Sequence, residues 1–242
     1  MNVFAPARCF DQNNPELIDR PGTDRVLLRE ELQMLEDLNR RLWGHQLVLE
    51  YVQRLLGSTR TKSLSILDLG TGAADIPRAI AAWARQRQLG VTITAVDGNP
   101  QVLEFAKEIC RDWPEIRLDQ HDLRALPYAA GSFDLVLCSL AMHHFDAADA
   151  IAILRQIKKM ARVGYIVNDL RRNWMAIVTT ELLANFTSRV FRHDAWQSCR
   201  ASFTVRELRA LAKQARLDNI QIRRHHWFFR MVLMGQNGQW NK

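Results

Sequence analysis

The sequence predicts an α/β fold, in which a mostly parallel sheet has helices on both faces. Two apolar segments, 65–69 and 91–97, favour buried strands, and each is followed by glycine and then by a helix-like pattern. Strand-like and helix-like segments continue to alternate as far as residue 167. This alternation predicts parallel strands that are joined by right-handed crossovers.

The first 62 residues favour a helical cap that precedes the sheet. Met1–Arg25 is polar and contains proline turn signals, so we expect it to wrap the surface or to close over the site. Apolar residues then recur at helical spacing over 24–56, with a break near Gly44, which predicts two helices. Residues 63–242 then form the core.

The turn after the first predicted strand organises the core. Gly70 and Gly72 tolerate positive φ and allow a ligand to approach the backbone. Asp75 and Pro77 suit a helix start, as a cap and as a first-turn proline. The dinucleotide fingerprint G-x-G-x-x-G is not met, because Asp75 occupies its last glycine position. We expect a nucleotide crevice here, with a plain strand-to-helix turn as the alternative.

Two further acids follow the next predicted strands. Asp97 ends the second strand, directly before Gly98-Asn99-Pro100, and an acid in this place can accept both hydroxyls of a ribose. Its alternative role is that of a solvated loop aspartate. Asp122 follows the third strand-like segment and can accept the exocyclic amine of an adenine.

These residues resemble the motifs of class I S-adenosylmethionine-dependent methyltransferases. The motifs are Asp68-Leu-Gly-Thr-Gly72, Asp97, His121-Asp122-Leu123 and Phe133–Ser139, and the resemblance covers roughly residues 40 to 235. Only Ala74 departs from the common glycine pattern. The resemblance implies a Rossmann-like sheet of seven strands with an antiparallel last hairpin.

Two further segments narrow the resemblance. Residues 140–145, with their pair of histidines, and residues 168–172 are similar to small-molecule methyltransferases such as the ubiquinone and menaquinone C-methyltransferases. The N-terminal signature of those enzymes is not evident here. A quinone acceptor therefore does not follow.

The cofactor implied by the resemblance is S-adenosylmethionine, with S-adenosylhomocysteine as product. The glycine turn and the helix start at Asp75 would face the methionine half, where backbone N–H groups can meet a carboxylate. Asp68 would orient the turn or receive the ammonium group, and Gly98 and Asn99 would line the adenine side. The expected cofactor-binding residues are Asp68, Gly70, Thr71, Gly72, Asp75, Asp97, Gly98, Asn99, Asp122, Leu123 and Ser139.

The acceptor side contains three candidate histidines. Methyl transfer is an in-line displacement that depends on positioning, and it needs a base only where the acceptor reacts as an anion, as a phenol does. His144 and His143 follow the fourth strand, and His193 lies further along the chain. We favour His144 as the base, because strand-end geometry should turn one of the neighbouring pair into the crevice. The alternative is that these histidines only pack or form hydrogen bonds.

The second half of the core contains an insertion and a hairpin. We expect helices over 76–89, 101–113, 147–161 and 204–214, a fifth strand over 164–167 and a closing antiparallel hairpin over 219–236. The insertion 171–203 is partly helical and rich in aromatic residues. A segment of this length beyond a strand end favours a lid or a substrate wall.

Composition limits the function classes. The 242 residues are 48% hydrophobic, with no signal-peptide pattern or apolar membrane span, and the four cysteines show no C-x-x-C spacing. We expect a cytoplasmic protein without a metal site. The net charge of +7 comes from basic residues spread along the chain, which favours a solvated face over nucleic-acid binding.

The predicted function is methylation of a small acceptor, aromatic or acyl-bearing, of the kind found in secondary metabolism. The alternatives are an RNA methyltransferase, which the net charge favours, and a catalytically silent partner subunit that keeps the cofactor fold. The oligomeric state and the methylated element, oxygen, nitrogen or carbon, stay open.

Overall fold

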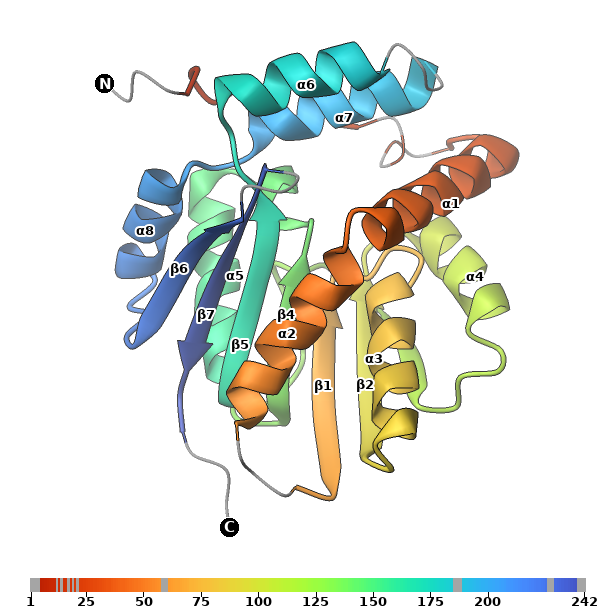
Figure 1. Ribbon diagram of the computed structural model, residues 1–242, viewed down its shortest axis with the longest axis vertical. Coiled ribbons are helices and arrows are strands. Elements are labelled where there is room, and N and C mark those ends of the chain that lie inside the picture. Colours follow the sequence, from red (N-terminus) through yellow and green to blue (C-terminus); the bar gives the residue numbers. More distant parts are fainter. Residues whose placement is uncertain are drawn as a thin grey trace.

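The computed structural model describes residues 5–238 with the exception of 12, 14, 17, 19, 21, 58–60, 185–188 and 226–228. Within 180–191 it describes the backbone of the remaining residues but none of the side chains. Its sheet contains seven strands in the order β3-β2-β1-β4-β5-β7-β6 (Figure 1). The strands are β1 (Ser63–Leu69), β2 (Gly90–Asp97), β3 (Ile116–Gln120), β4 (Phe133–Ser139), β5 (Ala161–Leu170), β6 (Ile220–His225) and β7 (Arg230–Gln236). The first five are parallel, whereas β7 runs antiparallel to both β5 and β6, so the predicted fold class is confirmed.

Helices cover both faces of this sheet. They are α1 (Arg25–Arg41), α2 (Gly44–Leu56), α3 (Asp75–Gln86), α4 (Pro100–Ile109), α5 (Ala147–Met160), α6 (Trp174–Ala184), α7 (Arg189–Ala201) and α8 (Val205–Gln214), with the short 3-10 helix η2 (Met142–His144) after β4. One apolar core joins α2 and α3 to the sheet, and a second joins α5 and α8 to the opposite face. Figure 1 shows α6 and α7 lying across the carboxyl ends of the parallel strands.

Local sequence explains most helix boundaries. The apolar stripe of α3 contains Ile76, Ile80 and Trp83, all buried at helical spacing. Thr204 and Glu207 form a reciprocal capping box that starts α8. The predicted helix 101–113 is shorter in the structure, because α4 ends at Ile109 and a turn follows.

The two expected N-terminal helices form an elbow above the glycine turn. Trp43 takes a left-handed conformation between α1 and α2, at φ 57°, so the predicted break near Gly44 is confirmed. Apolar residues Ile18, Leu28 and Leu32 pack with Ala73 of the turn in one small core cluster. Ile18 and the first half of α1 therefore lie over the carboxyl end of β1.

An N-terminal strap, which we define as the described residues of 5–20, continues this cover toward α7. Arg8 donates from Nε to the Ala201 carbonyl at 2.5 Å and from Nη2 to the Phe145 carbonyl at 2.7 Å. Burial lowers the pKa of Arg8 to about 10. Further along, the backbone N–H of Ile18 donates to Asp194 Oδ2 at 3.1 Å. The strap is thus tied to both η2 and α7.

The insertion between β5 and α8 consists mainly of α6 and α7, while residues 185–188 lie outside the described part. Its described side chains include the exposed apolar residues Trp174, Met175, Val178 and Trp196. In the part of the chain that the structure describes, none of the helices combines the length and the apolar character needed to cross a membrane.

Candidate functional site

The glycine turn is fixed by the end of β2. The backbone N–H groups of Gly70 and Thr71 both donate to the Val96 carbonyl at 2.9 Å. Gly70 has a φ of +68°, and a Cβ on it would lie 2.5 Å from the Cβ of Ala141, so a glycine is required there. Ala74 also takes a left-handed conformation, at φ 53°. The turn at the carboxyl end of β1 therefore depends on small residues.

Asp97 organises the loop that follows β2. Its Oδ2 accepts from the Gly72 N–H and its Oδ1 from the Asn99 N–H, both at 3.0 Å. Each carboxylate oxygen can accept a further hydrogen bond. Asn99 itself caps α4 through its bond to Gln101 N, and Gly98 lies between these two residues. The structure thus joins the glycine turn and the second acid in one site.

The third acid, Asp122, is paired with an arginine two residues further along the chain. Asp122 accepts from the backbone N–H and the guanidinium of Arg124, and its side chain remains 47% exposed. Those hydrogen bonds lower its pKa. The neighbouring Leu123 is buried and lies on the Gly70 side, where a Cβ on Gly70 would approach it to 3.9 Å. Leu123 therefore belongs to the turn, whereas Asp122 is held by Arg124.

The carboxylates of Asp68 and Asp75 have opposite environments. Asp68 is buried, and burial together with the nearby charges of Asp75 and Asp97 raises its pKa to about 7. Burial would also raise the pKa of Asp75, but hydrogen bonds from His45 and Asn39 outweigh it, so that pKa is lowered. The distances are 2.8 Å to His45 Nε2 and 2.6 Å to Asn39 Nδ2.

Asp75 departs from its expected role as a helix cap. The N-cap of α3 is Ala74, and Asp75 is the first helical residue, with its side chain turned toward α1 and α2. The physical reason is that Asn39 and His45 offer hydrogen bonds to a buried carboxylate, which a cap position would not supply.

Unpartnered polar atoms gather where the cofactor is expected. Asp68 Oδ1, Thr71 Oγ1 and Ser139 Oγ are buried and have no hydrogen-bond partner among the described residues. Buried polar atoms are nearly always paired in folded proteins, so such a group marks a place for a polar ligand. The donor set suits a ligand that carries both charges and hydroxyl groups.

A buried histidine–carboxylate pair lies at the ends of β4 and β5. His143 Nδ1 is 2.7 Å from Asp169 Oδ1, and both side chains are almost wholly buried. Because an ionised carboxylate only accepts, Nδ1 is assigned as the donor. Nε2 then keeps its lone pair and faces Glu16 Oε1 of the strap at 3.6 Å. Ser198 Oγ donates to the same Glu16 oxygen at 2.5 Å.

The other two candidate histidines are placed differently. His144 is half-buried, and its ring stacks on that of His143 with centroids 4.2 Å apart. His193 on α7 pairs through Nδ1 with Asp194 Oδ1 at 2.9 Å, and 39% of its side chain is exposed. Glu16, His143 and His144 present possible ligand atoms within 4.8 Å of one another, a grouping that the sequence did not indicate.

Four of the buried polar residues were not expected from the sequence as site residues. Asp169 was noticed only as part of a motif, and Glu16 follows a proline in a polar segment. Asn39 and Arg230 meet through a 2.9 Å hydrogen bond although 191 residues separate them. No local pattern signals such a contact.

A strand, a tight glycine turn and an acid at the end of the next strand define a nucleotide-binding α/β domain. The model of the methyltransferase domain family matches residues 66–164, which include these features. Malonyl-acyl-carrier-protein O-methyltransferase of Enterobacter lignolyticus is 29% identical over 154 residues, which cover 59% of this chain and 57% of that protein.

Solved methyltransferases share the fold. The plantazolicin methyltransferase BpumL, solved with S-adenosylhomocysteine, has a TM-score of 0.67 at 14% identity and covers 92% of this chain and 93% of its own. Magnesium protoporphyrin IX methyltransferase of Synechocystis PCC 6803 has a TM-score of 0.58 at 15% identity, with 89% of this chain and 100% of its own covered. The chain thus contains a stretch that matches the methyltransferase domain family, and it shares the fold of these solved enzymes. It spans less than two thirds of the length of the malonyl-acyl-carrier-protein relative.

Proposed function

We propose that the protein methylates a small acceptor, aromatic or acyl-bearing, at an atom that loses a proton during the reaction. The observation that carries this proposal is the His143–Asp169 pair at the carboxyl ends of β4 and β5. S-adenosylmethionine supplies an electrophilic methyl group, which an acceptor attacks in line with the departing sulfur. The enzyme must then position both molecules and remove the acceptor's proton.

The geometry favours His143 over His144 as the base. Asp169 holds Nδ1–H and fixes the tautomer, so Nε2 can take the proton of an acceptor hydroxyl or of an acidic carbon. Asp169 then stabilises the imidazolium that forms. Glu16 of the strap stands opposite Nε2, with its Oε1 3.6 Å away. The proton ends on Nε2 and the methyl group on the acceptor.

An anionic acceptor has a candidate partner at the end of β5. Arg171 is half-buried, and its Nε has no hydrogen-bond partner among the described residues. Burial, and then the charge of Arg224, lowers its pKa. The malonyl-acyl-carrier-protein relative is named for an acyl acceptor, which agrees with this proposal. A quinone acceptor is not part of it.

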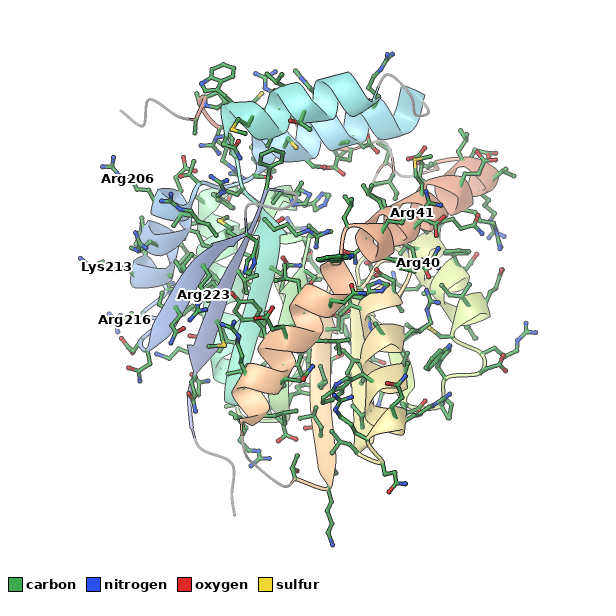
Figure 2. All side chains as sticks on the ribbon, in the orientation of Figure 1. Arg40, Arg41, Arg206, Lys213, Arg216 and Arg223 are labelled. Carbon is green, nitrogen blue, oxygen red and sulfur yellow. The ribbon has the colours of Figure 1, made fainter. Side chains whose placement is uncertain are left out.

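RNA methylation stays the second candidate because of the net charge of +7. Figure 2 shows labelled basic side chains at two separate places, Arg40 and Arg41 at the end of α1 and a second set around α8 and β6. Binding of a phosphate backbone would need a continuous basic track. This distribution supports a small acceptor, and the scattered spacing of the four cysteines, without C-x-x-C, supports a cytoplasmic location.

The test begins with calorimetric binding of S-adenosylmethionine, followed by a methylation screen of phenols, quinols and acyl aromatics. For an accepted substrate, His143→Gln should lower kcat by about 10²–10⁴-fold while cofactor affinity is kept. His193→Gln is the control and should keep most of the turnover, since the His193 side chain is 39% exposed on α7 whereas that of His143 is almost wholly buried at the ends of β4 and β5. Undiminished turnover of the His143 variant would remove it as the base. No turnover on any acceptor, with intact cofactor binding, would favour a silent partner subunit.

A further inference from the structure

A row of polar side chains crosses one face of the sheet at the carboxyl ends of four neighbouring strands. The row consists of Asp68 on β1, Ser139 on β4, Asn168 on β5 and Arg230 on β7. Each lies two positions from a residue of the core beneath α2 and α3, and alternate residues of a strand share a face. Ser139 of β4 pairs with Asn168 of β5. Arg230 of β7 pairs with Leu170, which lies two residues beyond Asn168 on β5. The row therefore faces α2 and α3.

The row lacks internal hydrogen-bond partners. Asp68 Oδ1, Ser139 Oγ, both amide atoms of Asn168, and Nε and Nη1 of Arg230 are buried without a partner among the described residues. Asn168 has no exposed surface, and Arg230 is 5% exposed. Six such atoms side by side are rare in a folded protein, which points to a polar ligand that completes them.

Arg230 reaches across the sheet toward the glycine turn. Its Nη2 donates to Asn39 Oδ1 at 2.9 Å, and Asn39 Nδ2 donates to Asp75 Oδ2 at 2.6 Å. Asp75 opens α3 directly after the turn that follows β1, whereas Arg230 starts β7, so Asn39 bridges these two segments. In Figure 1, α2 lies in front of β5 and β4. The row thus carries a positive group at its β7 end and a carboxylate at its β1 end.

A glycine at the elbow permits this arrangement. A Cβ on Gly44 would lie 1.7 Å from Asn39 Oδ1 and 2.9 Å from Arg230 Nη1. Asn39 and Arg230 can therefore approach the start of α2 only where no side chain is present. Three distant segments, the α1–α2 elbow, the start of α3 and the start of β7, converge on the guanidinium.

We propose that Arg230 and Asn168 bind the carboxylate at the methionine end of S-adenosylmethionine, while Asp68 and Ser139 receive its ammonium group. The inference rests on the proposed use of this cofactor. The methionine end carries a negative and a positive group on one carbon, and the row offers a guanidinium and an amide at one side and a carboxylate at the other. A buried charge needs such direct partners. Arg230 is thereby a cofactor-binding residue supplied by the last strand pair.

The test compares two ligands by calorimetry: S-adenosylhomocysteine, which has the amino-acid end, and 5′-methylthioadenosine, which lacks it. Arg230→Gln should weaken binding of S-adenosylhomocysteine by about 10- to 100-fold, as expected for a hydrogen bond to a charged group, and leave methylthioadenosine within about threefold. Asn168→Leu keeps the volume and should cause a smaller selective loss. Arg223→Gln is the matched control, because Arg223 is exposed on the adjoining strand β6 (Figure 2).

Three results would overturn the inference or its basis, and they differ from one another. Equal losses for both ligands in folded Arg230→Gln and Asn168→Leu proteins would show that these residues only support the fold. Unchanged affinities of Arg230→Gln for both ligands would contradict the assignment of Arg230 to the cofactor carboxylate and would favour an anionic acceptor as its partner. Failure of the unmodified protein to bind either ligand would contradict the proposed function itself. Circular dichroism confirms folding of each variant before titration.

Discussion

The titration of Asp68 gives the sharpest prediction. Its pKa of about 7 belongs to the ligand-free protein, where burial disfavours the carboxylate. Binding of an ammonium group requires the ionised form, so the association constant should follow the ionised fraction. That fraction rises about eightfold between pH 6 and pH 7.5 for a group of pKa about 7. Affinity for S-adenosylhomocysteine should rise by the same factor.

The substitution Asp68→Asn should abolish this rise of S-adenosylhomocysteine affinity with pH. It should also weaken binding at pH 7.5 by about 10- to 150-fold, which corresponds to about 1.5–3 kcal/mol for a hydrogen bond to a charged group. Calorimetry at three or more pH values measures both quantities. Asp75→Asn should keep a dependence of affinity on pH but shift its midpoint to lower pH, because the charge of Asp75 is one of the causes that raise the pKa of Asp68. A flat profile for the unmodified protein, or an unchanged slope in Asp68→Asn, would refute the reasoning.

The same group makes stability depend on pH, with a defined sign. The folded protein holds the Asp68 proton up to about pH 7, whereas the unfolded chain loses it near 3.8. Within that window the folded state binds more protons, so the contribution of Asp68 to stability is present at low pH and is lost as the pH rises toward 7. Urea unfolding of the ligand-free protein at pH 5 and pH 7, with Asp68→Asn as reference, measures it.

Three further predictions concern single residues. Asp97→Ala should weaken S-adenosylhomocysteine binding by about tenfold or more, because it removes the ribose acceptor and the partner of Gly72 N–H; unchanged calorimetric affinity would contradict the assignment. Gly235→Ala should destabilise the protein by about 1–3 kcal/mol in urea unfolding, since its Cβ would lie 2.1 Å from the buried Tyr165 ring; an unshifted midpoint would argue against that packing. Trp43→Gly should raise Tm by about 2–4 °C by relieving a left-handed φ of 57° at an exposed residue, and a lower Tm would show that the indole contributes packing.

The parts of the fold that the sequence predicted well depend on local signals. Segments 65–69 and 91–97 are apolar and end in glycine turns, and both lie within strands of the structure. The fifth strand was expected over 164–167 but spans Ala161–Leu170. Its polar end, Asn168 and Asp169, is buried by contacts with distant elements, and polarity alone does not predict burial of that kind.

The candidate site divides in the same way. The positions of Asp68 and Asp97 follow from strand ends and turns, which are short-range features. The direction of a carboxylate depends on its partners, so Asp75 turned toward Asn39, and Asp122 toward Arg124. The Asp122–Arg124 spacing was visible in the sequence and could have signalled that pair. The partners of Arg230 could not be found without the tertiary structure.

The contact between Asn39 and Arg230 also concerns how the protein is made. A ribosome delivers the five parallel strands, with their helices, well before it delivers β7. During that interval the nascent chain has its glycine turn and its acids but lacks the guanidinium that we assign to the cofactor carboxylate. Binding to the native state alone adds stability by mass action, so cellular S-adenosylmethionine would stabilise completed chains and leave partly synthesised ones unprotected.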